Sequence, residues 1–185
     1  YQIEWKVLNA ADFGFSQRRI RVFIVAIRSD VAKEKGLNFA DFFTHGVLSN
    51  AFVASSYSEQ NQFSLAEDPE EISDNFNLAG KGSPFLNSGV YADGVVLTAR
   101  ASYQSSTLVS GKLADALEPD SKVPPGYWIA SERLGEWEFL KGAKSLERIS
   151  KTGHVYSYSE GKMAFPDSLD RPSRTILTGE GGSSP

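Results

Sequence analysis

The sequence predicts an α+β protein, a small mixed domain with β-hairpins and short helices that follows two neighbouring strands. Ile3–Leu8 alternates apolar and polar residues, which is the period of a half-buried strand. Arg21–Ile27 is nearly all β-branched or aromatic, which is typical of a strand buried on both faces. Asp93–Gly94 favours a two-residue hairpin turn within Gly89–Ala101. Strands and helices do not alternate regularly, so the parallel sheet of a nucleotide-binding domain is not expected.

The middle of the chain predicts short helices and then a loop. Val31–Val53 has a patchy helical pattern that Gly36 and Gly46 interrupt, which favours several short helices over one long helix. Ala54–Leu78 is polar and acidic, and we interpret it as a loop or a mobile excursion.

The last third predicts two helices, a hairpin and a short strand. Thr107–Leu117 fits a helix, and Ser131 is a candidate cap for a second helix through Leu140. His154–Phe165 predicts a hairpin that turns at Glu160–Gly161. Thr175–Leu177 predicts a last short strand.

The composition excludes several kinds of site. The 185 residues are 41% hydrophobic and carry a net charge of −4, which argues against a stand-alone nucleic-acid binder. The chain has no cysteine, and His45 and His154 are far apart in sequence, so we expect no metal. No apolar run approaches the roughly 20 residues that span a bilayer, so we expect no membrane association. The chain begins at Tyr1 rather than Met, and we expect it to be a piece of a longer protein.

Basic residues gather directly before the apolar run of the second strand, at Gln17–Arg21. An arginine at the mouth of a strand can hold phosphate or carbonyl oxygens, because its fork donates two hydrogen bonds in one plane. The alternative is a basic turn that leads into a core strand. The other clustered basic residues are Arg28, Lys141, Lys144, Arg148, Lys151, Lys162, Arg171 and Arg174. If these groups converge, one face is cationic; the alternative is a mixed, solvated surface.

The stretch around this cluster resembles the eighth signature motif of the cytosine-5 DNA methyltransferases, in which Asn-Ala-x-x-x-Gly-x-Pro-Gln-x-Arg-x-Arg precedes a strand. The residues that match in type and spacing are Asn9, Ala10, Gly14, Gln17, Arg19 and Arg21. Ser16 stands where the family usually has proline, so the stiffening effect of proline on this turn is lost.

The rest of the chain extends this resemblance. Arg171–Thr178 is similar to the family's ninth motif. Pro84–Gly89, Trp137–Lys144 and Tyr156–Asp167 look like the bacterial restriction–modification branch. The resemblance implies two parts: residues 1–29 as the terminal strand pair of the catalytic sheet, and residues 30–185 as a target-recognition domain with the ninth motif at 171–182.

The resemblance also implies a function for the parent protein. A DNA (cytosine-5-)-methyltransferase transfers a methyl group from S-adenosylmethionine to carbon 5 of a flipped-out cytosine in a specific duplex site. The family's catalytic cysteine and Gly-rich cofactor loop are not in this sequence. We therefore expect the chain to bind no cofactor and to be inactive alone, with both groups on the missing N-terminal catalytic domain and with the cofactor site completed by a missing C-terminal segment. We expect a monomer that binds double-stranded DNA in the cytoplasm of a bacterium, associated with the nucleoid through DNA.

The resemblance assigns roles to individual residues. Arg21 would contact O2 of the cytosine, Arg19 would contact a phosphate or the catalytic loop, and Gln17 would support the pocket of the flipped base; Arg18 we interpret as a surface residue. The candidate DNA contacts are Arg174, Thr175, Thr178, Gly181, Gly182, Lys141, Lys144 and Arg148.

Two alternatives stay open at the level of sequence. One is a non-catalytic α+β module that binds DNA, protein or carbohydrate through its loops and its 12% aromatic residues. The other is a diverged, inactive relative of the methyltransferases that only binds DNA.

Overall fold

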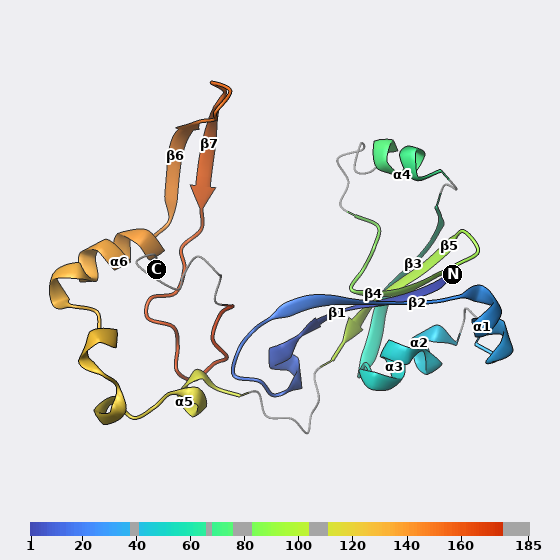
Figure 1. Ribbon diagram of the computed structural model, residues 1–185, viewed down its shortest axis with the longest axis horizontal. Helices are drawn as coiled ribbons and strands as arrows, with labels where there is room; N and C mark the ends of the chain where they lie inside the picture. The colour runs from blue at the N-terminus through green and yellow to red at the C-terminus, as the bar shows by residue number, and fades with distance from the viewer. Residues whose placement is uncertain (38–40, 66–67, 76–82, 104–110, 176–185) are drawn as a thin grey trace. The chain divides into compact units, whose positions relative to one another are not determined.

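The structure is a computed structural model that describes residues 1–37, 41–65, 68–75, 83–103 and 111–175. The chain forms two compact units (Figure 1). The first unit comprises Tyr1–Phe15 and Arg19–Ser110, and the second comprises Ser16–Arg18 and Gly111–Pro185. The predicted α+β class is confirmed, with short helices and with antiparallel pairing in both sheets.

The first unit is built on a five-stranded antiparallel sheet with the strand order β2-β1-β4-β5-β3. Its strands are β1 (Gln2–Asn9), β2 (Ile20–Ile27), β3 (Ser56–Ser64), β4 (Ser88–Ala92) and β5 (Val95–Ser102). The predicted neighbouring strands are β1 and β2, which pair along their whole lengths. The predicted hairpin is β4–β5, where Asp93 and Gly94 have φ angles of 49° and 79°. A two-residue turn of this kind needs positive φ at both positions, which explains the Asp-Gly pair.

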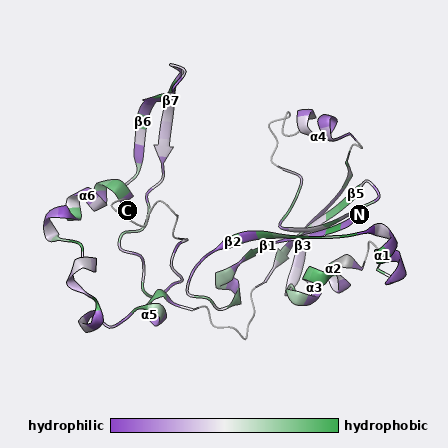
Figure 2. Cartoon of the chain, in the orientation of Figure 1, coloured by the Kyte–Doolittle hydropathy of each residue, from purple (hydrophilic) through white to green (hydrophobic). Residues whose placement is uncertain are grey.

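Short helices accompany this sheet, as the interrupted pattern predicts. They are η1 (Ala10–Phe13), α1 (Ser29–Glu34), α2 (Phe42–His45), α3 (Val47–Ala51) and α4 (Pro69–Asn75). Helix α3 contacts β1 and β2. Helix α4 carries three acidic residues of the polar segment, Glu70, Glu71 and Asp74, and is mostly hydrophilic in Figure 2.

The interpretation of Ala54–Leu78 as a loop is wrong for its first part, because β3 is a nine-residue strand. This strand pairs only with β5, and a bulge at Glu59 interrupts the register. Tyr57 and Phe63 are half-buried, while most of the other side chains are exposed. An edge strand of this kind needs few apolar residues, so its composition resembles that of a loop.

The expectation that the second strand is buried on both faces is also wrong for this structure. Strand β2 lies at the edge of the sheet and pairs only with β1. Ile20, Val22 and Ile24 are 61%, 57% and 64% exposed. Among the described residues, the chain therefore presents an apolar strand whose outer edge is unpaired and whose Ile20, Val22 and Ile24 side chains are exposed.

Strand β1 alternates as predicted, but its polar residues are the more buried ones. Glu4 and Lys6 are 1% and 0% exposed, while Trp5 is half-buried. The Glu4 carboxylate accepts hydrogen bonds from the backbone N–H groups of Leu48 and Ser49 at 2.9 and 2.8 Å, and from the Ser49 hydroxyl at 2.8 Å. A buried carboxylate is tolerated here because α3 supplies these donors.

Lys6 is held in a different way from Glu4. Its Nζ donates to the Tyr57 hydroxyl at 3.4 Å and lies 5.3 Å from the centre of the Tyr103 ring. Burial lowers the pKa of Lys6, and the nearby charge of Glu4 partly opposes this shift. The sheet thus encloses a polar cluster beside the apolar core, which contains Leu8, Ala101 and Tyr103.

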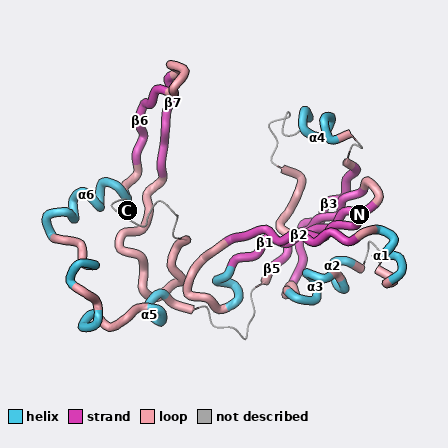
Figure 3. Tube along the Cα trace, in the orientation of Figure 1, coloured by secondary structure: helices cyan, strands magenta, loops and turns pink. Residues whose placement is uncertain are grey.

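The second unit combines short helical segments with one β-hairpin, joined by loops (Figure 3). Its elements are α5 (Leu113–Ala116), η2 (Asp120–Lys122), η3 (Pro125–Tyr127), η4 (Ser131–Arg133), α6 (Leu134–Lys141), β6 (Lys144–Ile149) and β7 (Val155–Glu160). The predicted helix Thr107–Leu117 is represented by α5, and residues 107–110 lie outside the described residues. Ser131 makes no cap, because the N-cap of α6 is Arg133 and no side-chain cap bond forms.

The predicted turn at Glu160–Gly161 is wrong. Strand β7 pairs with the preceding strand β6, and the turn lies at Ser150–His154, where Gly153 has a φ of 83°. Strand β6 was not predicted because Glu147 and Arg148 are exposed on opposite faces of the hairpin, so the strand has no apolar–polar alternation. Thr175 is not part of a strand, and residues 176 and 177 lie outside the described residues.

Candidate functional site

The residues of the eighth motif lie where β1 ends and β2 begins. Asn9 caps the short helix η1, and its Oδ1 accepts hydrogen bonds from the N–H groups of Ala11 at 3.4 Å and Arg19 at 3.0 Å. The N–H of Ala10 donates to the Arg19 carbonyl at 3.1 Å. Gly14 ends the helix with a φ of 87°, a conformation that favours glycine. These contacts give a physical reason for Asn and Gly at these positions, because they bring Arg19 back to the end of β1.

Arg19 and Arg21 line the same cavity, of about 320 Å³. They are two positions apart on extended chain, so their side chains leave the same face. The other lining residues are Leu8, Ala10, Phe13, Phe15, Phe23 and Phe52. Phe52 lies 5.5 Å from Phe13 and 5.8 Å from Phe23 between ring centroids. Two guanidinium groups beside an aromatic, apolar hollow suit a flat ligand that carries a carbonyl oxygen.

Gln17 and Arg18 belong to the second unit, where they meet the ninth motif. Gln17 forms an isolated parallel bridge with Ser173, and the Arg18 N–H donates to the Ser173 carbonyl at 2.8 Å. The Ser173 N–H donates to Ser16 at 2.8 Å, and the Thr175 hydroxyl donates to the Arg18 carbonyl at 2.5 Å. The structure thus joins backbone segments that are 157 positions apart.

The candidate DNA contacts have different environments. Lys141 is 3% exposed, and its Nζ lies 6.0 Å from the centre of the Trp137 ring. Lys144 donates from Nζ to the Leu140 carbonyl at 2.6 Å and to Glu160 at 2.9 Å. Such burial favours a structural role for both lysines. Thr178, Gly181 and Gly182 lie outside the described residues.

Arg148 is an exposed cation on strand β6. Its guanidinium lies 3.7 Å from the centre of the Tyr158 ring, and the two side chains share one face of the hairpin. The Tyr158 hydroxyl donates to Glu160 at 2.5 Å, and this bond, together with the bond from Lys144, lowers the pKa of Glu160. In Figure 2 the hairpin is hydrophilic or neutral along most of its length, and Figure 1 shows it extending away from α6. It is therefore a two-stranded ribbon with solvent on both faces.

Arg174 forms an ion pair with Asp167, with 3.3 Å between Nε and Oδ2. Both side chains are about three-quarters buried. Thr175 uses its hydroxyl to hold Arg18, as described above. Both residues of the ninth motif therefore have partners within this unit.

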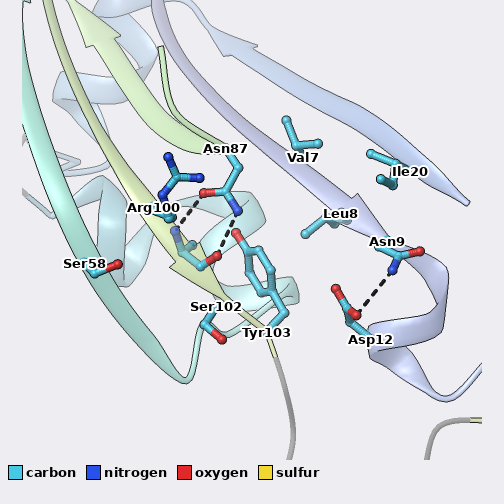
Figure 4. A pocket seen from close by; sticks show the side chains of 11 residues that line it. Val7, Leu8, Asn9, Asp12, Ile20, Ser58, Asn87, Arg100, Ser102 and Tyr103 are labelled. Carbon is cyan, nitrogen blue, oxygen red and sulfur yellow. Dashed lines mark hydrogen bonds between the residues drawn. The ribbon is translucent and has the colours of Figure 1, made fainter. Parts of the chain in front are cut away.

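A second cavity of the first unit, of about 540 Å³, was not foreseen from the sequence (Figure 4). Its polar wall includes Asn9, Asp12, Asn87, Arg100 and Tyr103. The Asn87 side chain accepts the N–H of Ala101 on β5 at 2.7 Å and donates to the Ala101 carbonyl at 2.8 Å. Burial raises the pKa of Tyr103 to about 12. These residues come from separate segments of the chain, so no local pattern reveals the cavity.

The described residues contain no group of three or more His, Asp or Glu side chains that could hold a metal ion. Nor does any helix in the described part of the chain have the length and apolar character needed to cross a membrane.

Comparison with known proteins defines the class. Residues 1–100 match the family of C-5 cytosine-specific DNA methylases, and the chain belongs to this family. The type II methyltransferase M.Sau3AI of Staphylococcus aureus is 34% identical over 189 residues, which cover 97% of this chain and 43% of that protein. The protein M.OihORF3336P of Oceanobacillus iheyensis is 54% identical over 35 residues, 19% of this chain and 8% of that protein. The chain thus spans less than half the length of these relatives, and no solved structure matches it.

Proposed function

We propose that this chain is the part of a bacterial DNA (cytosine-5-)-methyltransferase that holds the flipped-out cytosine and recognises the DNA duplex. The single observation that carries the proposal is the convergence of Arg19 and Arg21 on one apolar, aromatic cavity within the eighth motif. A basic turn that only leads into a core strand would not need two guanidinium groups beside such a hollow.

The parent enzyme would supply the rest of the chemistry. Its catalytic cysteine would add to carbon 6 of the cytosine. S-adenosylmethionine, bound outside these residues, supplies the methyl group when present. This sequence contains no cysteine, and we assign no cofactor-binding residue to it.

The residues of this chain would act on the base and on its surroundings. The guanidinium of Arg21 would donate a hydrogen bond to O2 of the cytosine, where negative charge gathers as the thiolate adds. A hydrogen bond of this kind is stronger in an apolar cavity, where water does not compete. Arg19 would contact a phosphate or the catalytic loop, and Gln17 would support the base pocket.

The open edge of β2 supports the proposed division of the chain. Residues 1–29 would complete the catalytic sheet of the parent, whose next strand would pair with the open edge of β2. Residues 30–185 would form the recognition part. Strand β1 also pairs with β4, so the sheet continues from the proposed catalytic strands into the recognition part.

The β6–β7 hairpin supports the role in recognition. A two-stranded ribbon fits the major groove of B-form DNA, and the exposed Arg148 would face the duplex. The proposal keeps Arg174, Thr175, Thr178, Gly181, Gly182, Lys141 and Lys144 as further candidate contacts, with the two lysines acting mainly by supporting the hairpin. The partner is double-stranded DNA, and we place the parent, as a monomer, in the bacterial cytoplasm.

The test compares two variants of the full-length protein. Arg21→Ala should lower methyl transfer by about 10²- to 10³-fold, because it removes a donor that acts on developing charge. Duplex affinity should fall far less. Arg28→Ala is the matched control, since Arg28 is an exposed arginine near the end of β2 that pairs only with Asp30 in the described structure. Equal losses of transfer and binding in Arg21→Ala would refute the assignment.

A further inference from the structure

The second unit contains a cavity of about 360 Å³ to which the proposals above assign no ligand. Its lining residues are Arg18, Ala164, Asp167, Ser168, Arg171 and Pro172. Arg18 comes from the eighth motif, and the others come from the segment that leads into the ninth. We infer that this cavity binds a backbone phosphodiester of the DNA substrate, held by Arg18 and Arg171; this inference rests on the proposed function.

The positions of the two arginines are fixed by backbone contacts. Arg18 bonds to Ser173 through its N–H and to Thr175 through its carbonyl. The Arg171 carbonyl accepts the N–H of Leu113 at 2.9 Å. The cavity is therefore assembled from chain segments that lie far apart in sequence but are joined by main-chain hydrogen bonds. Preorganised arginines of this kind bind an anion without the cost of ordering a loop.

The charges around the cavity favour an anion. Asp167 forms an ion pair with Arg174, and Asp170 accepts a hydrogen bond from Ser168. The charges of Arg171 and Lys112 both help to lower the pKa of Asp170. The cations Arg18, Arg171, Arg174 and Lys112 thus outnumber the carboxylates Asp167, Asp170 and Asp115, the last of which accepts the Lys112 N–H.

Arg18 and Arg171 are exposed residues that line this cavity, and within the described residues the side chain of neither has a hydrogen bond or ion pair. Two such groups on one cavity match the geometry of a phosphodiester, because each fork can donate two hydrogen bonds to its oxygens. A phosphate contact positions a protein along the duplex without reading sequence. Arg18 directly precedes Arg19 in the chain, so this contact would set the register of the duplex beside the proposed base-holding motif.

The experiment measures duplex binding by the full-length protein at several salt concentrations. Arg18→Gln and Arg171→Gln should each weaken binding by about tenfold, equally on specific and non-specific duplexes. Each should also reduce the slope of log affinity against log salt by about 0.9, the value for one lost phosphate contact. Arg133→Gln removes the same charge from an exposed arginine of this unit that pairs with Glu136, and it should change neither quantity. Arg18→Lys, which keeps the charge but not the fork, should fall between the wild type and Arg18→Gln.

Single methylphosphonate substitutions in the duplex then identify the ligand. At one backbone position, removal of the phosphate charge should weaken duplex binding by the wild type but not by Arg18→Gln or Arg171→Gln. The inference is overturned if both glutamine variants keep the duplex affinity and salt slope of Arg133→Gln. It is equally overturned if no methylphosphonate position weakens binding by the wild type while leaving the glutamine variants unchanged. It is also overturned if inorganic phosphate raises the unfolding temperature through these arginines while duplex binding is unchanged, because the cavity would then hold a free anion. A wild-type protein that neither binds nor methylates DNA would instead refute the proposed function.

Discussion

Replacing Glu4 with Gln should destabilise the first unit, because the carboxylate is 1% exposed and accepts three hydrogen bonds from α3. The amide keeps one oxygen but turns an NH₂ group toward the N–H of Leu48 or of Ser49, and that backbone donor then loses its acceptor. Charge-assisted hydrogen bonds contribute about 1.5–3 kcal/mol each, and a buried donor left unpaired costs about 1–3 kcal/mol. Lys6 would also lose the favourable field of its neighbour. We therefore expect a loss of about 3 kcal/mol in the free energy of unfolding.

For a protein of this size, such a loss lowers the unfolding temperature by about 6–12 °C. The measurement is urea unfolding of the protein that contains this chain, with amide hydrogen exchange in β1 and β4 reporting the first unit. Glu34→Gln is the control, since Glu34 is exposed and should change stability by less than about 0.5 kcal/mol. Equal effects of the two substitutions would refute the reasoning. In a double-mutant cycle, Glu4→Gln and Lys6→Met should couple by at least about 0.5 kcal/mol, because they share one cluster.

Two further predictions concern the same sheet. The pKa of Tyr103 is raised to about 12, so the folded state holds its proton at pH values where the unfolded state, with a pKa near 10.0, has lost it. Stability should therefore fall by about 1–2 kcal/mol as the pH rises from 10 to 12. Tyr103→Phe should lose less stability than wild type over this range in urea titrations, and parallel curves would contradict the assignment. Gly89→Ala should cost about 1–3 kcal/mol, because its Cβ would lie 2.1 Å from the Trp5 ring. Gly135→Ala on α6 is the control, because its added Cβ would meet no atom within 4 Å, and it should be neutral or stabilising. Thermal unfolding measures both variants, and a similar loss of stability in the two would contradict the predicted clash.

Local signals predicted the parts of the fold that depend on neighbouring residues. The alternation of Ile3–Leu8 and the Asp93–Gly94 pair each act within a few residues, and both are confirmed as β1 and the β4–β5 turn. The pairing of β1 with β4 joins segments about 85 positions apart, and no periodic pattern encodes it. Strand β3 escaped prediction for a related reason, since an edge strand can be polar along its whole length.

The buried face of β1 could not be predicted, because the sequence does not show which partners meet Glu4 and Lys6. Alternation fixes which residues share a face but not which face is covered. The donors that make burial of Glu4 possible come from α3, and the aromatic rings beside Lys6 come from β3 and the end of β5.

The candidate site divides in the same way. The spacing of Arg19 and Arg21 implies a shared face, and both line one cavity. Resemblance indicated that Gln17 and Ser173 lie in two motifs of one family, but not that their backbones form a bridge. The surroundings of Arg148, by contrast, depend on the register of the β6–β7 hairpin. The sequence predicted the hairpin turn at Glu160–Gly161, whereas the turn lies before β7, at Ser150–His154.

The bridge between Gln17 and Ser173 affects which insertions and deletions this protein can tolerate during evolution. It closes the intervening chain into a loop whose two ends lie side by side, held by hydrogen bonds that do not depend on the loop's content. The entropy of closing a loop grows only with the logarithm of its length, by about 0.6 kcal/mol for each doubling. Insertions and deletions of tens of residues between the two ends therefore cost little, provided that the strands added to the sheet are kept. The segment can vary in length and surface while the motif residues at its ends keep their partners.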